Sequence, residues 1–169
     1  MMRKLEVGAI LFLLSASPSF AQCDNLPADA QAYLKAHLGW SIVQLKDLDA
    51  DDQAAWNKHY PGKCPGMADV DLDGRGAKPA LALFRQQNEK AFEQVVIFSS
   101  DGSVRTLVPA EIVSRPYVIW RNEPGAYEDF NSGKKTRMAH DSLGYEAIGA
   151  TVELYYFSKG KFHSLLNSD

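Results

Sequence analysis

Three aspartates alternate with apolar residues in segment 69–74, and a glycine follows the third aspartate. The aspartates are Asp69, Asp71 and Asp73, and the glycine is Gly74. Hard cations such as calcium are held by six to eight oxygen ligands. Alternate carboxylates on a tightly curled loop can converge on one ion, and a glycine allows the sharp bend. The three aspartates are therefore the candidate metal ligands of this chain, with calcium as the expected ion.

The residues that follow bear on how tightly this loop would hold an ion. In an EF-hand-type loop that opens at Asp69, the twelfth position carries an acid that supplies two oxygens; this chain has Ala80 there. The ninth position is Ala77, and Lys78 adds a positive charge. With the Arg75 carbonyl and water as further ligands, we expect weak binding, with a Kd of about 10⁻⁴–10⁻³ M. The alternative is an acidic surface turn that leads into a strand without holding an ion.

The aspartate segment resembles calcium loops of the FG-GAP/VCBS type, in which D-x-D-x-D-G precedes a hydrophobic strand. That strand would cover residues 80–84 here, and the further acid of that family's loop falls near Ala77. More widely, the chain resembles a group of uncharacterised secreted bacterial proteins. The residues that carry this resemblance are Cys64-Pro65-Gly66, the aspartate segment, His140-Asp141-Ser142 and the aromatic-rich ending 155–169. The resemblance brings no known activity with it.

The residue types of a hydrolase triad occur side by side at His140, Asp141 and Ser142. Neighbouring side chains diverge, so these three cannot form a triad among themselves, because a triad is assembled in space. The sequence contains no G-x-S-x-G nucleophile elbow, and its four histidines are not at the spacing of a zinc site. A catalytic site would instead require folding to bring His140 together with acids such as Asp141 or Glu146.

Cys23 and Cys64 are the two cysteines of the chain and predict a disulfide bond. An even number of cysteines in an oxidising compartment usually pairs. There is no C-x-x-C motif, and Cys64 lies in segment 61–66, which is rich in proline and glycine. The bond would connect the N-terminal segment to this turn, and loop-closure entropy would make it worth about 3–4 kcal/mol.

The N-terminal pattern predicts export. Arg3 and Lys4 precede an apolar run centred on residues 7–14, and Ser19 and Ala21 stand at the small-residue positions of a cleavage site. This is the pattern of a secretory signal peptide, and the apolar run is too short for a membrane anchor. We therefore expect a signal peptide over 1–21, a single globular domain over 22–169, and a periplasmic or secreted location without a transmembrane anchor.

The charge of the expected mature chain argues against nucleic acid as a partner. The whole chain has 18 Lys and Arg and 21 Asp and Glu. Arg3, Lys4 and Glu6 fall in the signal segment, which leaves 16 basic and 20 acidic residues and a net charge of −4. Binding to a nucleic-acid backbone requires a basic face, so we expect no nucleic-acid partner.

The hydrophobic pattern predicts an α+β fold. Apolar residues recur at three- and four-residue spacing in 26–38, and a second helix is expected over about 49–60. From about residue 79 onward, short β-like runs are separated by turn residues, and the connections are too short for crossover helices. We therefore expect two N-terminal helices packed on an antiparallel β-meander of five to seven strands. Segment 122–135, rich in Pro, Gly, Asn and acids, is expected to be a long loop.

No catalytic constellation stands out on this small, exported scaffold. The leading hypothesis is therefore a non-catalytic binding protein, whose partner is an envelope protein or polymer and whose calcium, if bound, orders the Asp69–Asp73 segment. One alternative is a hydrolase acting on envelope material. The other is an inhibitor or immunity protein that blocks a cell-wall hydrolase, for which segment 122–135 is the candidate inhibitory loop.

Overall fold

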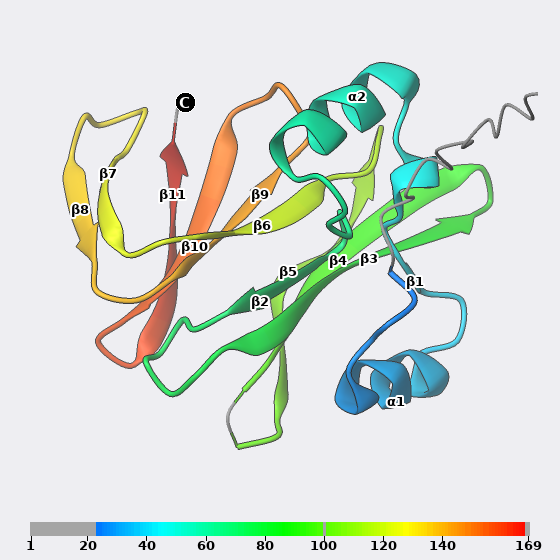
Figure 1. Cartoon of the computed structure of the whole chain (residues 1–169), viewed down its shortest axis with the longest axis horizontal. Coiled ribbons are helices and arrows are strands. Elements are labelled where there is room, and N and C mark those ends of the chain that lie inside the picture. The colour runs from blue at the N-terminus through cyan, green and yellow to red at the C-terminus, as the bar shows by residue number, and fades with distance from the viewer. Residues whose placement is uncertain (1–22, 100, 168–169) are drawn as a thin grey trace, which may run out of the picture.

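The computed structural model describes residues 23–99 and 101–167 (Figure 1). The expected signal peptide, 1–21, lies outside the described residues. Two α-helices and one short 3₁₀ helix precede most of the strands, and all strand pairs are antiparallel. The α+β class with an antiparallel meander is therefore confirmed. Within the described residues the strands number eleven, because several short strands join the meander of longer ones.

Helix α2 (Ala50–His59) begins where the acidic segment before it predicts a helix start. The Asp52 amide donates to Asp49 Oδ1 at 2.9 Å, so the side chain of Asp49 caps the helix N-terminus. Helix α1 (Ala28–Ala36) begins after Pro27 and buries Ala30. A 3₁₀ turn, η1 (Leu45–Asp47), lies between the two helices.

The first sheet, which we call sheet A, is built on two long neighbouring strands. These are β3 (Lys78–Gln87) and β4 (Lys90–Phe98), and β5 (Val104–Val113) follows as the terminal strand on the far side of β4. The short strands β1 (Ser41–Ile42) and β2 (Met67–Val70) both pair with β3.

The second sheet, sheet B, has the strand order β11-β10-β9-β6. Its strands are β6 (Val118–Asn122), β9 (Ser142–Glu146), β10 (Val152–Ser158) and β11 (Lys161–Asn167). A separate two-stranded hairpin of β7 (Gly125–Glu128) and β8 (Lys135–Met138) lies beside β11 (Figure 1). Segment 122–135 is therefore partly a β-hairpin and not the long loop expected from its composition.

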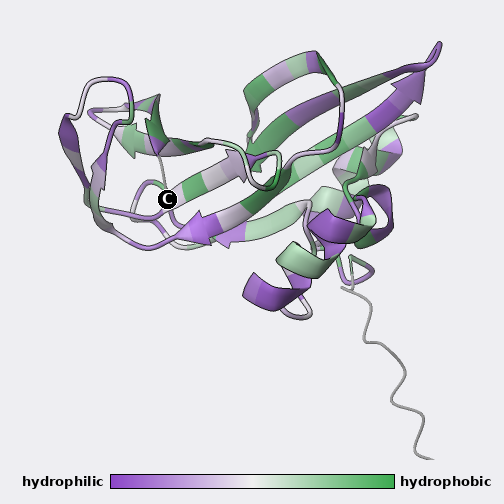
Figure 2. Ribbon diagram, turned by 90° about the horizontal axis from the view of Figure 1, so that it is seen from above, coloured by the Kyte–Doolittle hydropathy of each residue, from purple (hydrophilic) through white to green (hydrophobic). Residues whose placement is uncertain are grey.

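Two apolar clusters form the core, one on each face of sheet A. The larger cluster includes Val95 and Ile97 of β4 together with residues of sheet B, so it fills the space between the sheets. The smaller cluster includes Val96 and Phe98 and lies under α1. Alternate residues of a strand point to opposite faces, so β4 contributes to both clusters. In Figure 2 the apolar residues concentrate in the strands, while the turns and the outer helix surfaces are mostly hydrophilic.

The predicted disulfide is confirmed. Cys23 and Cys64 are bonded across a sequence separation of 41 residues, with their Cα atoms 5.1 Å apart. Both cysteines are buried and belong to the smaller apolar cluster. The bond therefore ties the N-terminal segment, which carries α1, to the outer face of sheet A.

Candidate functional site

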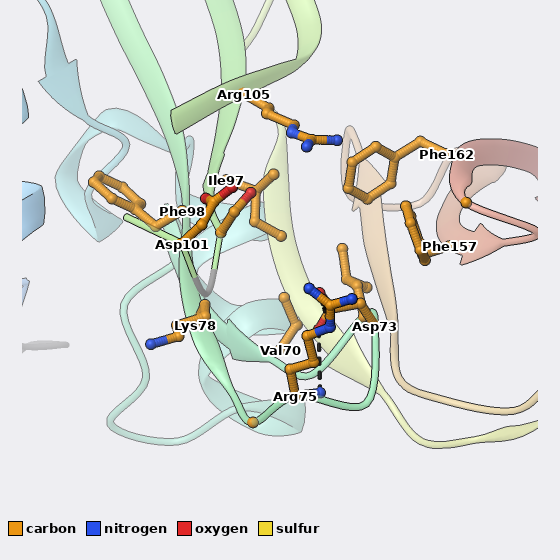
Figure 3. Close-up of a pocket in the computed structure, with 14 residues that line it drawn as sticks. Val70, Asp73, Arg75, Lys78, Ile97, Phe98, Asp101, Arg105, Phe157 and Phe162 are labelled. Atoms are coloured by element: carbon orange, nitrogen blue, oxygen red, sulfur yellow. Dashed lines mark hydrogen bonds and ion pairs between the residues drawn. The ribbon is translucent and has the colours of Figure 1, made fainter. Parts of the chain in front are cut away.

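A cleft of about 230 Å³ lies where one end of sheet A meets the turn between β10 and β11 (Figure 3). We call it the inter-sheet cleft. One wall is the loop after β2, which contains two of the three aspartates of segment 69–74. The other walls are the ends of β3, β4 and β5 and the β10–β11 hairpin. Its lining residues include Val70, Leu72, Asp73, Arg75, Gly76, Lys78, Ile97, Asp101, Arg105, Phe157 and Phe162.

Two phenylalanines give the cleft an apolar, rigid side. Phe157 and Phe162 are directly opposite each other on β10 and β11, and their rings meet edge-to-face with centroids 5.2 Å apart. The hairpin turn between them has Lys159 at φ 51° and Gly160 at φ 78°. Positive φ at both central residues is the requirement of the tight hairpin turn that keeps two strands in register. The turn therefore fixes both rings at the cleft.

Arg105 is the cation of the cleft whose side chain extends toward Phe162 (Figure 3). It is exposed at the start of β5, and it makes no hydrogen bond or ion pair with any described residue. Its acidic neighbour, Asp101, already accepts hydrogen bonds from Ser103 N (2.9 Å) and Ser103 Oγ (2.6 Å), which lower the pKa of Asp101. In Figure 3 the Arg105 side chain extends toward Phe162, whereas Lys78 points away from the two phenylalanines.

The aspartates of the loop shape its turn. Asp71 Oδ1 accepts from Gly76 N at 3.0 Å, and Asp73 Oδ1 accepts from Arg75 N at 3.1 Å. Asp73 Oδ2 also lies 3.8 Å from Arg75 Nε. Gly74 and Gly76 have φ values of +77° and +100°, which glycine adopts without a steric penalty. The tight curl expected from the sequence is therefore present, and backbone amides already occupy part of the carboxylate surface.

Asp141 anchors this loop to sheet B. Its carboxylate accepts from Asp71 N at 2.8 Å, and its own amide donates to Asp71 O at 3.2 Å. Arg121 Nε lies 2.8 Å from the same carboxylate oxygen. The side chain of Asp141 is only 4% exposed. The ring of His140 approaches Gly74 so closely that a Cβ there would overlap it. Asp141 and His140, which the sequence offered as acid and base, thus both contact the aspartate loop.

The three aspartates do not share one cavity. Asp69 lies exposed on β2 and lines a different groove, of about 420 Å³, beside Trp56 and Trp120. Asp73 lines the inter-sheet cleft. Within residues 23–99 and 101–167, no three His, Cys, Asp or Glu side chains are grouped so that they could hold a metal ion. Calcium binding by Asp69, Asp71 and Asp73 stays a prediction that requires the loop to rearrange.

Glu93 is the residue with unusual electrostatics that sequence reasoning missed. It is fully buried on β4, and its Oε2 accepts from Tyr117 N at 2.9 Å. Burial, supported by the nearby charge of Glu111, raises the pKa of Glu93 from 4.5 to about 8. Burial also raises the pKa of the neighbouring Tyr145 hydroxyl. The sequence does contain a signal for this burial, because side chains alternate between the two faces of a strand. In β4 this alternation places Glu93 on the same face as the core residues Val95 and Ile97.

Three aromatic side chains of α2 and β6 and the turn after α2 pack into the core. Trp56, Tyr60 and Trp120 form a row with ring centroids 4.5 and 5.9 Å apart. Trp56 is 2% exposed and Trp120 is 9% exposed. A groove of about 660 Å³ borders this row and is also lined by His59 and Glu146. Because the two indole rings are covered, they offer little stacking surface to a ligand.

Comparisons with protein-family models, with curated proteins and with solved structures find no match for this chain. Among the described residues, no helix has the length and apolar character needed to cross a membrane.

Proposed function

We propose that the protein is an exported, non-catalytic binding protein whose ligand occupies the inter-sheet cleft. The ligand belongs to an envelope protein or polymer, and calcium, where it binds, orders the Asp69–Asp73 segment. The observation that carries the proposal is the cleft itself, in which Arg105, which makes no hydrogen bond or ion pair with another described residue, faces two phenylalanines on a rigid turn. The cleft combines apolar side chains with charged ones, so a ligand there can make both apolar contacts and orienting polar contacts.

Export is supported by two independent features of the chain. The first is the signal-peptide pattern of residues 1–21. The second is the buried Cys23–Cys64 disulfide, because such bonds persist in oxidising compartments outside the cytosol. The wider resemblance of the chain to a group of uncharacterised secreted bacterial proteins fits the same location.

The electrostatics favour binding over catalysis. An enzyme needs an acid or base with a perturbed pKa inside a cavity. Glu93 has such a pKa, yet it lines neither the inter-sheet cleft nor the two grooves beside Trp56 and Trp120. Asp141 is held in an ion pair with Arg121 and in hydrogen bonds to the aspartate loop. A hydrolase would therefore have to open the core or break this anchor to expose its acid.

One observation favours the alternative of an inhibitor that plugs the cleft of a cell-wall hydrolase. Phe130 is 61% exposed at the turn of the β7–β8 hairpin. This turn is fixed by Asp129 Oδ1, which accepts from Ser132 N at 2.8 Å and from Ser132 Oγ at 2.7 Å. The Phe130 amide also donates to Leu166 O at 2.7 Å. An aromatic ring on a preorganised turn is a typical anchor residue of an interface.

Photo-cross-linking separates these two modes of binding. The photoreactive p-benzoylphenylalanine is placed at Phe162, in the cleft, and in a second protein at Phe130, on the β7–β8 hairpin. Each protein is exported in a bacterial host, irradiated in intact cells, and analysed for cross-linked envelope components with and without a calcium chelator. Circular dichroism of the purified proteins controls for folding.

The site of cross-linking decides between the hypotheses. We expect a discrete adduct from position 162, and a calcium-ordered loop requires that the chelator reduce it. An adduct confined to position 130 would contradict the cleft and favour the inhibitor. Folded protein that gives no adduct at either position would contradict a binding role for both surfaces.

A further inference from the structure

We infer that the inter-sheet cleft recognises the free carboxylate of a peptide C-terminus whose last side chain is apolar. The inference rests on the proposed function, because it names the ligand of the same cleft. It follows from three features: the state of the arginine, the size of the cavity, and the strand that begins at its rim.

The first feature is the arginine. The guanidinium of Arg105 makes no hydrogen bond or ion pair with another described residue. Its charge helps to lower the pKa of the nearby Asp101, whose carboxylate accepts hydrogen bonds from Ser103 instead. Of the other two cations in the lining, Arg75 forms an ion pair with Asp73 at 3.8 Å, and Lys78 points away from the phenylalanines (Figure 3). Guanidinium groups bind carboxylates through two parallel hydrogen bonds. The direct hydrogen bonds that Arg105 lacks are therefore those that a ligand carboxylate would accept from its guanidinium.

The second feature is the size and apolar lining of the cavity. Ile97, Phe157 and Phe162 contribute apolar surface directly beside Arg105 (Figure 3). The volume of about 230 Å³ is below the roughly 300–1,000 Å³ of sites that enclose a whole small molecule. The cleft therefore suits an end group, such as one apolar side chain with its carboxylate, and not a long acyl chain.

The third feature is strand β5, which begins at the cleft. Arg105 is its second residue, and β5 is the terminal strand of sheet A. Its outer edge pairs with no strand among the described residues. An unpaired edge can accept an extended peptide as an added strand through main-chain hydrogen bonds. A peptide lying along residues 104–108 would have its end at Arg105, and this favours a peptide over a free fatty acid as the source of the carboxylate.

Isothermal titration calorimetry of the oxidised protein tests the inference with defined probes. The first probe is the tetrapeptide acetyl-Gly-Ser-Val-Leu with a free carboxylate, and the second is the same peptide as its C-terminal amide. Decanoate is the third probe and represents a lipid source. The variants are Arg105→Ala and Arg105→Lys, and Arg137→Ala on β8 is a matched control for an exposed arginine outside the cleft.

We expect the acid to bind and the amide to bind at least about tenfold more weakly, because a hydrogen bond to a charged group contributes about 1.5–3 kcal/mol. Arg105→Ala should weaken binding of the peptide acid by about tenfold or more. The affinity of Arg105→Lys should lie between those of Arg105→Ala and the original protein, and Arg137→Ala should leave the affinity unchanged. Equal binding of acid and amide, or unchanged binding by Arg105→Ala, would overturn the inference. Tighter binding of decanoate than of the peptide would overturn the peptide source.

The carboxylate inference and the proposed binding function can be contradicted separately. If the acid does not bind at about 1 mM while position 162 still cross-links a partner, the carboxylate inference is wrong and the binding function stands. If both experiments fail with folded protein, the proposed function is contradicted as well.

Discussion

Replacing Glu93 by glutamine should remove a large part of the pH dependence of stability. Glu93 is fully buried between the sheets, and the groups that face it are the Tyr117 amide, the Tyr145 side chain and the charge of Glu111. Burial raises its pKa from 4.5 in the unfolded chain to about 8 in the folded protein. The folded state therefore holds this proton more tightly than the unfolded state between these two values.

The sign and size of the effect follow from linkage. The pKa of Glu93 is higher in the folded protein than in the unfolded chain. The contribution of Glu93 to the free energy of unfolding is therefore fully present below about pH 4.5 and is lost as the pH rises toward 8. One pKa unit corresponds to about 1.4 kcal/mol, so the free energy of unfolding should fall by about 3–4 kcal/mol between pH 5 and pH 8 from this residue alone. In the Glu93→Gln variant the side chain keeps its shape but cannot ionise. The free energy of unfolding of this variant should therefore not show the fall between pH 5 and pH 8.

Urea unfolding followed by tryptophan fluorescence at pH 5, 6, 7 and 8, at constant ionic strength, measures the slope. At pH 8 we expect Glu93→Gln to be more stable relative to the original protein than it is at pH 5. Glu123→Gln serves as a matched control, because Glu123 is exposed and its neutralisation should leave the slope unchanged. Parallel pH profiles for Glu93→Gln and the original protein would refute the reasoning.

Three further perturbations have defined outcomes. Replacing both cysteines of the Cys23–Cys64 pair by serine should lower the free energy of unfolding by about 4 kcal/mol, since the bond closes a 41-residue separation; an unchanged urea midpoint would contradict this. Gly144→Ala places a Cβ against the ring of Trp120 and should cost about 1–3 kcal/mol, with a shift in tryptophan emission; native emission and stability would show that the ring moves freely. Calcium titrated calorimetrically should bind with a Kd of about 10⁻⁴–10⁻³ M and fail to bind Asp71→Asn; no heat from the original protein would leave the loop as an empty turn.

Local sequence signals predicted those parts of the fold that depend on local chemistry. Asp49 marks the start of α2 because its side chain can cap only the amides that follow it closely. Lys159-Gly160 mark the β10–β11 turn because both positions require positive φ. The cysteine pair was predictable because only one pairing within the chain was available.

The features that sequence reasoning missed depend on distant partners. Asp141 is buried because Arg121 and the amide of Asp71, 70 residues away, satisfy its carboxylate, and no local pattern encodes that meeting. Glu93 is buried by tyrosines of the opposite sheet in the same way. The strands β7 and β8 are four residues each and pair with each other, so the many turn residues around them obscured their alternation.

Sheet A has two apolar faces, and only one of them is covered by the other sheet. The outer face, which includes Leu81, Leu83 and Val96, is covered by the N-terminal segment that the disulfide holds in place. Reduction would release this cover and expose an apolar patch while the core between the sheets stays packed. Exposed patches of this kind drive association. We therefore expect reduced protein to self-associate at concentrations where the oxidised protein stays dispersed.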